Sequence, residues 1–154
     1  MGKAANSSIS LKQIHVTDNF WNKYVHLVKD VIIPYQWDIL NDKLEDVETS
    51  HCIENFKIAA GEKEGEFQGA VFQDTDVAKW LEAVGFVLNY ERDEKLEELA
   101  DETIELIGRA QQPDGYLNTY FTIKEPDGRW SNLMEGHELY TCLLYTSPSP
   151  RDSA

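Results

Sequence analysis

Two consecutive segments with helical periodicity, joined by a short polar turn, constrain the fold of this chain most. The first segment begins at Asp74-Thr75-Asp76, a sequence that can cap a helix, and the second begins at Asp93. The faces that they would bury recur at spacings of three and four, at Val77, Trp80, Leu81, Val84, Val87 and Leu88, and then at Leu96, Leu99, Thr103, Leu106, Ile107 and Ala110. With Asn89 to Arg92 as the turn, this pattern predicts an antiparallel pair of helices.

Shorter patterns predict further elements. Thr17-Asp18-Asn19 can cap a helix that starts at Phe20, and Pro34 predicts a kink or break near Ile33 before a second helical piece from Tyr35 to Leu40. Other helical segments are expected at Cys52–Ala60 and from Leu133 to about Tyr140. The remaining patterns favour extended chain at Ile9–Val16 and Tyr116–Ile123, and turns at Pro113-Asp114-Gly115 and Pro126-Asp127-Gly128.

We therefore expect a mainly α fold with short extended segments. Helix hairpins joined by short loops need further hairpins to bury their apolar faces, which is typical of a helical array or toroid. A partial array leaves apolar helix faces without partners. The chain is therefore expected to be poorly stable alone and to self-associate through those faces.

The charge of the chain excludes two classes of partner. Asp and Glu number 28 against 14 Lys and Arg, which gives a formal net charge of −14. Nucleic acid requires a basic surface, and an anionic membrane would repel this chain, whereas a neutral sugar is compatible with it. Residues 1–10 lack the apolar run of a signal peptide, and no stretch approaches the length of a transmembrane helix. A cytoplasmic setting is expected, and Cys52 and Cys142 form no disulfide framework.

Three single residues are candidates for contacts with a ligand, and each also has an ordinary structural interpretation. Asp74 lies at a predicted helix start, where a carboxylate is stabilised whether or not it binds anything. Tyr116 follows an Asp-Gly turn, which could present its ring at the mouth of a cavity or be purely structural. Gln36 follows the break expected at Pro34, and its amide can bind a hydroxyl as both donor and acceptor, or be a plain surface amide.

The cluster Glu135-Gly136-His137-Glu138 is the richest in chemistry. A histidine between carboxylates can bind a metal, act as an acid or base, or hydrogen-bond a sugar hydroxyl. The spacing does not match the HExxH pattern of zinc proteases. Spacing alone favours a hydrogen-bonding or structural role for His137.

Five segments, in this order, resemble the N-terminal part of the β-L-arabinofuranosidase family, glycoside hydrolase family 127. They are Thr17–Trp21, Val31–Gln36, Phe72–Ala83, Gln112–Phe121 and Arg129–Tyr140. The resemblance implies an (α/α)6 barrel, of which this chain supplies the first few helices. It also implies retaining hydrolysis of β-L-arabinofuranosyl bonds by a zinc-bound cysteine thiolate and a glutamate acid/base.

The resemblance places those catalytic and zinc-binding residues beyond this chain. We therefore expect no cofactor in the chain itself, zinc in the full-length family, and no activity from the chain alone. The residues that would hold the hydroxyls of a neutral sugar are Gln36, His137, Asp74, Tyr116 and Glu135. The alternative function is a stand-alone helical module that binds carbohydrate or serves as a scaffold without catalysis.

The sequence also suggests boundaries. Residues 1–10 are expected to be flexible, and residues 11–140 to form the N-terminal part of the catalytic barrel. After Tyr140 the sequence departs from the family and resembles a translated sequencing adapter. Residues 141–154 are therefore expected to be a non-native tail, in which Cys142 has no role as a zinc ligand.

Overall fold

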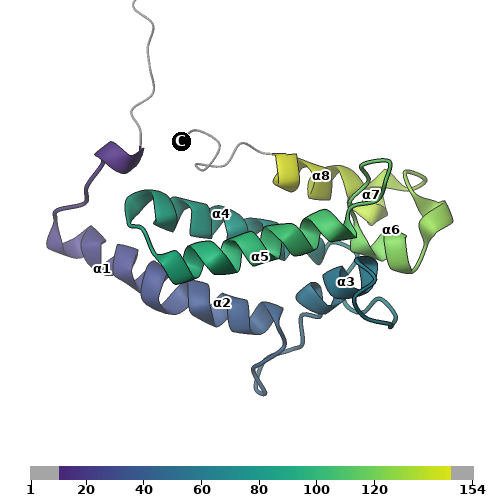
Figure 1. The fold of residues 1–154 in the computed structure, drawn as a ribbon, viewed down its shortest axis with the longest axis horizontal. Coiled ribbons are helices and arrows are strands. Elements are labelled where there is room, and N and C mark those ends of the chain that lie inside the picture. Colours follow the sequence, from purple (N-terminus) through teal and green to yellow (C-terminus); the bar gives the residue numbers. More distant parts are fainter. Residues whose placement is uncertain (1–10, 147–154) are drawn as a thin grey trace, which may run out of the picture.

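A computed structural model describes residues 11–146, and all regular elements within that range are helices (Figure 1). The mainly α fold expected from the sequence is therefore confirmed. The flexible N-terminus predicted for residues 1–10 and most of the predicted tail lie outside the described residues. None of the helices formed by residues 11–146 is both long and apolar enough to cross a membrane.

The predicted helix pair is the centre of the fold. Helices α4 (Asp74–Tyr90) and α5 (Glu94–Ala110) lie side by side and run in opposite directions (Figure 1). Asp93 caps α5 as predicted, because its carboxylate accepts hydrogen bonds from the backbone N–H groups of Lys95 and Leu96. The predicted inward faces are confirmed. Their buried members are Val77, Trp80, Val84, Val87, Thr103, Leu106 and Ala110.

A long helical segment precedes this pair and packs against α4. It consists of α1 (Asn19–Leu27), a π-helical turn η2 (Val28–Ile32) and α2 (Ile33–Leu40), and Asp18 caps α1 as predicted. The expected break at Pro34 is instead a widened turn, in which the N–H of Ile33 bonds the carbonyl of Val28. Proline lacks an N–H and its ring clashes with the carbonyl four residues earlier, so widening the turn relieves the clash while the chain stays helical.

Trp80 ties α2 to α4. Its indole N–H donates to the carbonyl of Ile33 at 3.1 Å, and its ring lies 4.5 Å from the ring of Trp37, centroid to centroid. Around this pair a single core forms from α2, α4, α5 and α3 (Cys52–Ala59), the helix predicted at residues 52–60. This close-packed core holds the N-terminal half of α4 against α2 and α3.

The C-terminal part differs from the sequence-based expectation. Residues 119–123 form helix α6 (Thr119–Ile123), not extended chain, because the side chain of Asn118 caps it through the N–H of Phe121. The turn predicted at Pro126 is a 3-10 helix, η3 (Pro126–Gly128). The helix expected from Leu133 is two helices, α7 (Leu133–Gly136) and α8 (Glu138–Thr146), which meet at His137.

The N-terminal lead-in also differs. Leu11–Gln13 form a 3-10 turn, η1, so the short strand or extended lead-in expected at Ile9–Val16 is wrong for these three residues, and residues 14–17 have no regular structure. The alternation of apolar and polar residues there has no neighbouring strand to pair with. A local turn satisfies the backbone in its place.

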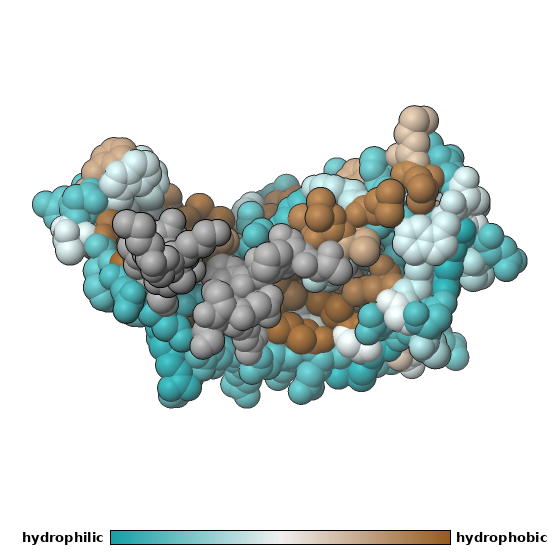
Figure 2. Space-filling view, turned by 90° about the horizontal axis from the view of Figure 1, so that it is seen from above, coloured by the Kyte–Doolittle hydropathy of each residue, from teal (hydrophilic) through white to brown (hydrophobic). Residues whose placement is uncertain are grey.

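Large apolar side chains remain on the surface. Figure 2 views the molecule from the side on which α8 lies in Figure 1, and hydrophobic side chains gather around a hollow there. Leu139 and Leu143 of α8 are 59% and 62% exposed, and Phe20 and Trp21 of α1 are 60% and 61% exposed. Exposed apolar side chains gathered on a helix are a typical place for further packing.

Candidate functional site

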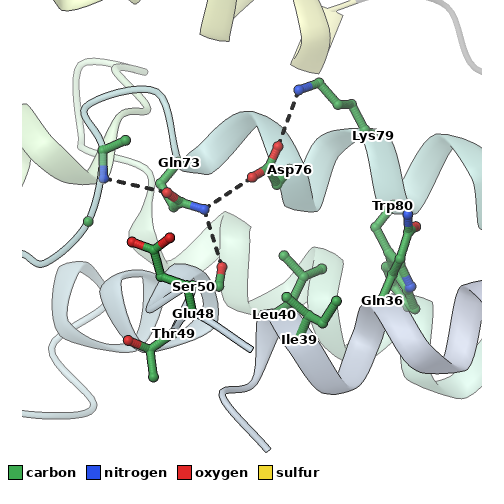
Figure 3. Close-up of a pocket in the computed structure, with 12 residues that line it drawn as sticks. Gln36, Ile39, Leu40, Glu48, Thr49, Ser50, Gln73, Asp76, Lys79 and Trp80 are labelled. Carbon is green, nitrogen blue, oxygen red and sulfur yellow. Dashed lines mark hydrogen bonds and ion pairs between the residues drawn. The ribbon is translucent and has the colours of Figure 1, made fainter. Parts of the chain in front are cut away.

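A cavity of about 570 Å³ lies between α2, the start of α4 and two loops (Figure 3). Ile39, Leu40 and Trp80 supply its apolar lining. The polar side chains that line it are Gln36, Glu48, Thr49, Ser50, Gln73, Asp76 and Lys79. A cavity that combines an indole with several convergent polar groups is the usual form of a site for a small polar ligand.

Gln73 organises one wall of this cavity. Its amide NH2 donates to Ser50 Oγ at 3.3 Å and to Asp76 Oδ2 at 3.1 Å, and its amide oxygen accepts from the N–H of Ala70 at 3.4 Å (Figure 3). Lys79 extends the network, since its Nζ lies 3.2 Å from Asp76 Oδ1. Because two loops and a helix share these bonds, the polar groups of this wall are held in a common arrangement.

The loop that carries Glu48, Thr49 and Ser50 is fastened by Asp42. The Asp42 carboxylate accepts hydrogen bonds from the N–H of Ser50 at 2.7 Å and from the N–H of His51 at 3.0 Å. Asp42 and His51 both have left-handed backbone conformations, with φ of 56° each. Such conformations are unfavourable for residues other than glycine, so the two hydrogen bonds stabilise a bend that the chain would otherwise resist.

Of the five predicted site residues, Gln36 lies in the cavity. It projects from α2, and within the described part of the chain its amide has no hydrogen-bond partner. Figure 3 shows it beside Trp80, across the cavity from Gln73 and Asp76. An unpaired amide at that place offers one acceptor and two donor hydrogens to a ligand.

Asp74 lies behind the cavity wall and does not cap α4. It is only 2% exposed, and its carboxylate accepts from both the N–H and the hydroxyl of Thr119 at 2.6 Å. The residue before the helix is Gln73, which makes no side-chain capping bond. Burial raises the pKa of Asp74 to about 6, although the hydrogen bonds from Thr119 act to lower it. The stretch Asp74-Thr75-Asp76, expected to cap this helix, therefore does not do so through Asp74, whose carboxylate bonds to Thr119.

Tyr116 is also buried, and its ring is not presented to solvent. Its hydroxyl donates to Glu138, and a second Glu138 oxygen accepts from the N–H of Trp130 at 2.8 Å. The guanidinium carbon of Arg129 lies 4.1 Å from the centre of the Tyr116 ring. Burial, followed by the hydrogen bond to Glu138, raises the pKa of Tyr116 above its usual range, so the hydroxyl keeps its proton.

His137 and Glu135 lie at the junction of α7 and α8. His137 has a left-handed backbone conformation with φ of 51°, and its ring packs edge-on against Phe72 at 5.4 Å. Phe72 directly precedes Gln73 in the chain, so the imidazole contacts the neighbour of a residue that lines the cavity. Among residues 11–146, neither nitrogen of that imidazole has a hydrogen-bond partner. Glu135 is exposed on α7.

Two residues with evident structural roles were not among the sequence-based candidates. Gln73 directly precedes Asp74, and its bond to Ser50 joins residues 23 positions apart, a contact that spacing along the chain does not predict. Glu138 belongs to the cluster around His137, but its burial at 2% exposed could not be read from the sequence. The one sequence signal that could have indicated its burial is that Glu138 begins a largely apolar helix.

The described residues do not form a site that fits zinc. Within residues 11–146, no three or more His, Cys, Asp or Glu side chains come close enough together to hold a metal ion. Cys52 is fully buried and its thiol donates to the carbonyl of Gln73 at 3.3 Å. Burial, with the nearby charge of Asp74, raises the pKa of this thiol, which is the opposite of what a thiolate ligand requires.

Residues 11–146 thus form a helical domain in which a polar cavity lies beside an indole, an arrangement that suits a small polar ligand. The catalytic domain of the GH127 β-L-arabinofuranosidases matches residues 13–146, and the chain belongs to this family of glycoside hydrolases.

Two solved structures and one curated relative are similar to the chain. A GH127 β-L-arabinofuranosidase from Geobacillus stearothermophilus T6 is 59% identical, with a TM-score of 0.80 over 85% of this chain. A second GH127 β-arabinofuranosidase is 29% identical, with a TM-score of 0.77 over 88% of this chain. The non-reducing end β-L-arabinofuranosidase of Bifidobacterium longum subsp. longum is 39% identical over 148 residues, or 86% of this chain. The chain spans only 22% of the length of each.

Proposed function

We propose that this chain supplies one wall of the sugar-binding pocket of a retaining β-L-arabinofuranosidase. The observation that carries the proposal is the cavity in which the unpaired amide of Gln36 faces the network of Gln73, Asp76 and Lys79. A furanose presents hydroxyl groups that both donate and accept, and this lining offers both kinds of partner. The mutual ion pair of Asp76 and Lys79 offsets their charges, which suits a neutral ligand.

In this proposal the chain binds and orients, and the rest of the enzyme performs the bond cleavage. His137 at the junction of α7 and α8 adds a second set of unpaired polar atoms for the sugar. Glu135 is a peripheral member of the set, exposed two residues before His137. Asp74 and Tyr116 support the wall from within, because their polar atoms are already bonded to Thr119 and Glu138.

The proposed architecture is the first part of an (α/α)6 barrel. The hairpin of α4 and α5, with α2 and α3 packed on it, supports this proposal, because helical arrays are built from packed helix hairpins. The exposed apolar surfaces of α1 and α8 are where further helices would pack. On this basis the 154-residue chain alone is expected to bind sugar weakly and to hydrolyse nothing.

The test is a graft in which residues 13–146 replace the matching segment of the Geobacillus enzyme, which is 59% identical. We expect the graft to hydrolyse a chromogenic β-L-arabinofuranoside. Gln36→Ala in the graft should lower kcat/KM by roughly tenfold or more, since a polar contact to a substrate hydroxyl is lost. Gln13→Ala is the matched control, an exposed glutamine outside the cavity, and should change kcat/KM less than about twofold.

Two outcomes would contradict the proposal. Full activity of the Gln36→Ala graft would show that the cavity is not part of the sugar-binding site. Hydrolysis of the same substrate by the 154-residue chain alone, at a rate near that of the graft, would show that the chain carries its own catalytic groups.

A further inference from the structure

Glu138 is a buried carboxylate directly beside His137. It is 2% exposed, and its two oxygens accept from the Tyr116 hydroxyl and from the N–H of Trp130. Burying a carboxylate is costly, and an apolar side chain of similar size would fill the same space at less cost. Stability alone therefore does not account for a carboxylate at this place.

The bonds of Glu138 converge on the short segment that carries His137. Trp130 belongs to the segment between η3 and α7, and Tyr116 follows the turn after α5. Glu138 therefore fastens the first residue of α8 to two separate segments of the chain. The Tyr116 ring is in turn held by Arg129, whose guanidinium pairs with Asp114 at 3.2 Å.

The backbone around His137 is fixed from other sides as well. A Cβ on Gly136 would lie 2.9 Å from Cζ of Phe121, so only glycine fits against that ring. The carbonyl of His137 accepts from the N–H of Thr141 at 3.0 Å and from its hydroxyl at 3.2 Å. Within the described residues, the imidazole nitrogens of His137 have no hydrogen-bond partner. The arrangement is that of a side chain whose support is fixed and whose polar atoms are left for a ligand.

We infer that Glu138 and Tyr116 are positioning residues that hold the imidazole of His137 where it hydrogen-bonds a hydroxyl of the bound sugar. This inference rests on the proposed function. Tyr116 was expected from the sequence to contact the sugar. In this inference it acts indirectly, by positioning His137. The Tyr116 hydroxyl is the donor and the Glu138 carboxylate the acceptor, and neither touches the ligand.

The experiment is a double-mutant cycle on kcat/KM in the graft described above. Tyr116→Phe removes one hydroxyl and keeps the ring, and should lower kcat/KM by roughly tenfold, because small displacements of a binding group have large effects on rate. In the His137→Ala background the same substitution should change kcat/KM by less than about twofold. Glu138→Gln keeps one acceptor for Trp130 and should cost less than Glu138→Ala.

A control separates positioning from general stability. The Thr103 hydroxyl is buried in α5 and donates to the carbonyl of Leu99 at 2.7 Å. Thr103→Val also removes one buried hydrogen bond, and should lower the melting temperature without changing kcat/KM. Equal losses from Tyr116→Phe with His137 present and in the His137→Ala background would overturn the inference. The proposed function would survive that result, provided that His137→Ala is itself impaired.

A second measurement uses the 154-residue chain and needs no activity. The sequence has four histidines, so their imidazole Cε1–H signals can be assigned by NMR. Tyr116→Phe should shift the signal of His137 and leave those of His15, His26 and His51 in place. An unchanged His137 signal would contradict the inference whatever the graft does.

Discussion

The carboxylate of Asp74 receives two hydrogen bonds from Thr119, one from its N–H and one from its hydroxyl, each 2.6 Å long. The backbone carbonyl of Asp74 accepts a third bond, from the hydroxyl of Tyr145 at 2.9 Å. The first residue of α4 therefore joins α6 and α8 to the central helix pair. Its charge and its hydrogen bonds both bear on the stability of the chain.

We first predict a pH dependence of stability that Asp74 causes. Its pKa is about 6 in the folded protein against 3.8 for the free group, so between these values the folded state holds a proton that the unfolded chain releases. The free energy of unfolding should therefore fall as pH rises from about 4 to 6, by about 3 kcal/mol in total, and remain flat above that range. Urea unfolding at a series of pH values should show this slope in the native chain. Asp74→Asn should lack it, and an equal slope in both would contradict the assignment.

A second prediction concerns the partner of this carboxylate. Thr119→Val keeps the shape of the side chain and removes the hydroxyl that donates to Asp74. The free energy of unfolding at pH 7 should fall by about 2 kcal/mol, because a hydrogen bond to a buried charged group is lost. The pKa of Asp74 should rise further, since this bond favours the ionised form. A carboxyl NMR titration of Asp74 measures the shift, and a lowered pKa would count against the arrangement.

Trp80 provides a third prediction. Trp80→Phe leaves the carbonyl of Ile33 without its donor and shrinks the ring that packs on Trp37. The loss should be about 2–3 kcal/mol in the free energy of unfolding. Trp21→Phe is the matched control, because Trp21 is 61% exposed, and it should change stability by less than about 0.5 kcal/mol. Thermal unfolding followed by circular dichroism compares the two, and equal effects would be evidence against a role of Trp80 in joining α2 to α4.

The fourth prediction concerns self-association. Phe20, Trp21 and Tyr24 form an aromatic cluster on α1, with ring centroids 5.1–6.0 Å apart and each ring about half exposed or more. We expect the 154-residue chain to associate through this cluster in a concentration-dependent way. Sedimentation velocity should show less association for Phe20→Ser with Trp21→Ser. Phe86→Ser, which removes a 49% exposed ring from α4, is the control and should associate like the native chain.

Local signals in the sequence predicted the elements that are stabilised locally. Asp93 and Asp18 cap the helices expected of them, because a cap bonds N–H groups two or three residues away. Residues 119–123 were expected to be extended, but Asn118 caps a helix there. Capping and packing override intrinsic preference in so short a segment.

The candidate site could be predicted only in part. Gln36 was identified beside a proline that alters its helix, and it does line the cavity. The bonds of Asp74 to Thr119 and of Tyr116 to Glu138 join residues 45 and 22 positions apart, and no spacing rule connects such pairs. The sequence therefore identified candidate polar residues. Only the fold distinguishes Gln36, which lines the cavity, from Asp74 and Tyr116, whose polar atoms are bonded within the protein. The contacts of these residues with sugar stay a prediction.

The widened turn at Val28–Ile32 has a consequence for how this segment tolerates insertion and deletion. A turn closed by a bond from Ile33 to Val28 encloses one residue more than an α-helical turn. One residue corresponds to a rotation of about 100° around the helix axis. The wider turn absorbs that rotation, so deleting a single residue from it would restore an α-helical turn and leave the aromatic cluster of α1 and Gln36 of α2 on the faces that they now occupy. This long helix can thus lose one residue at the turn without altering the cavity.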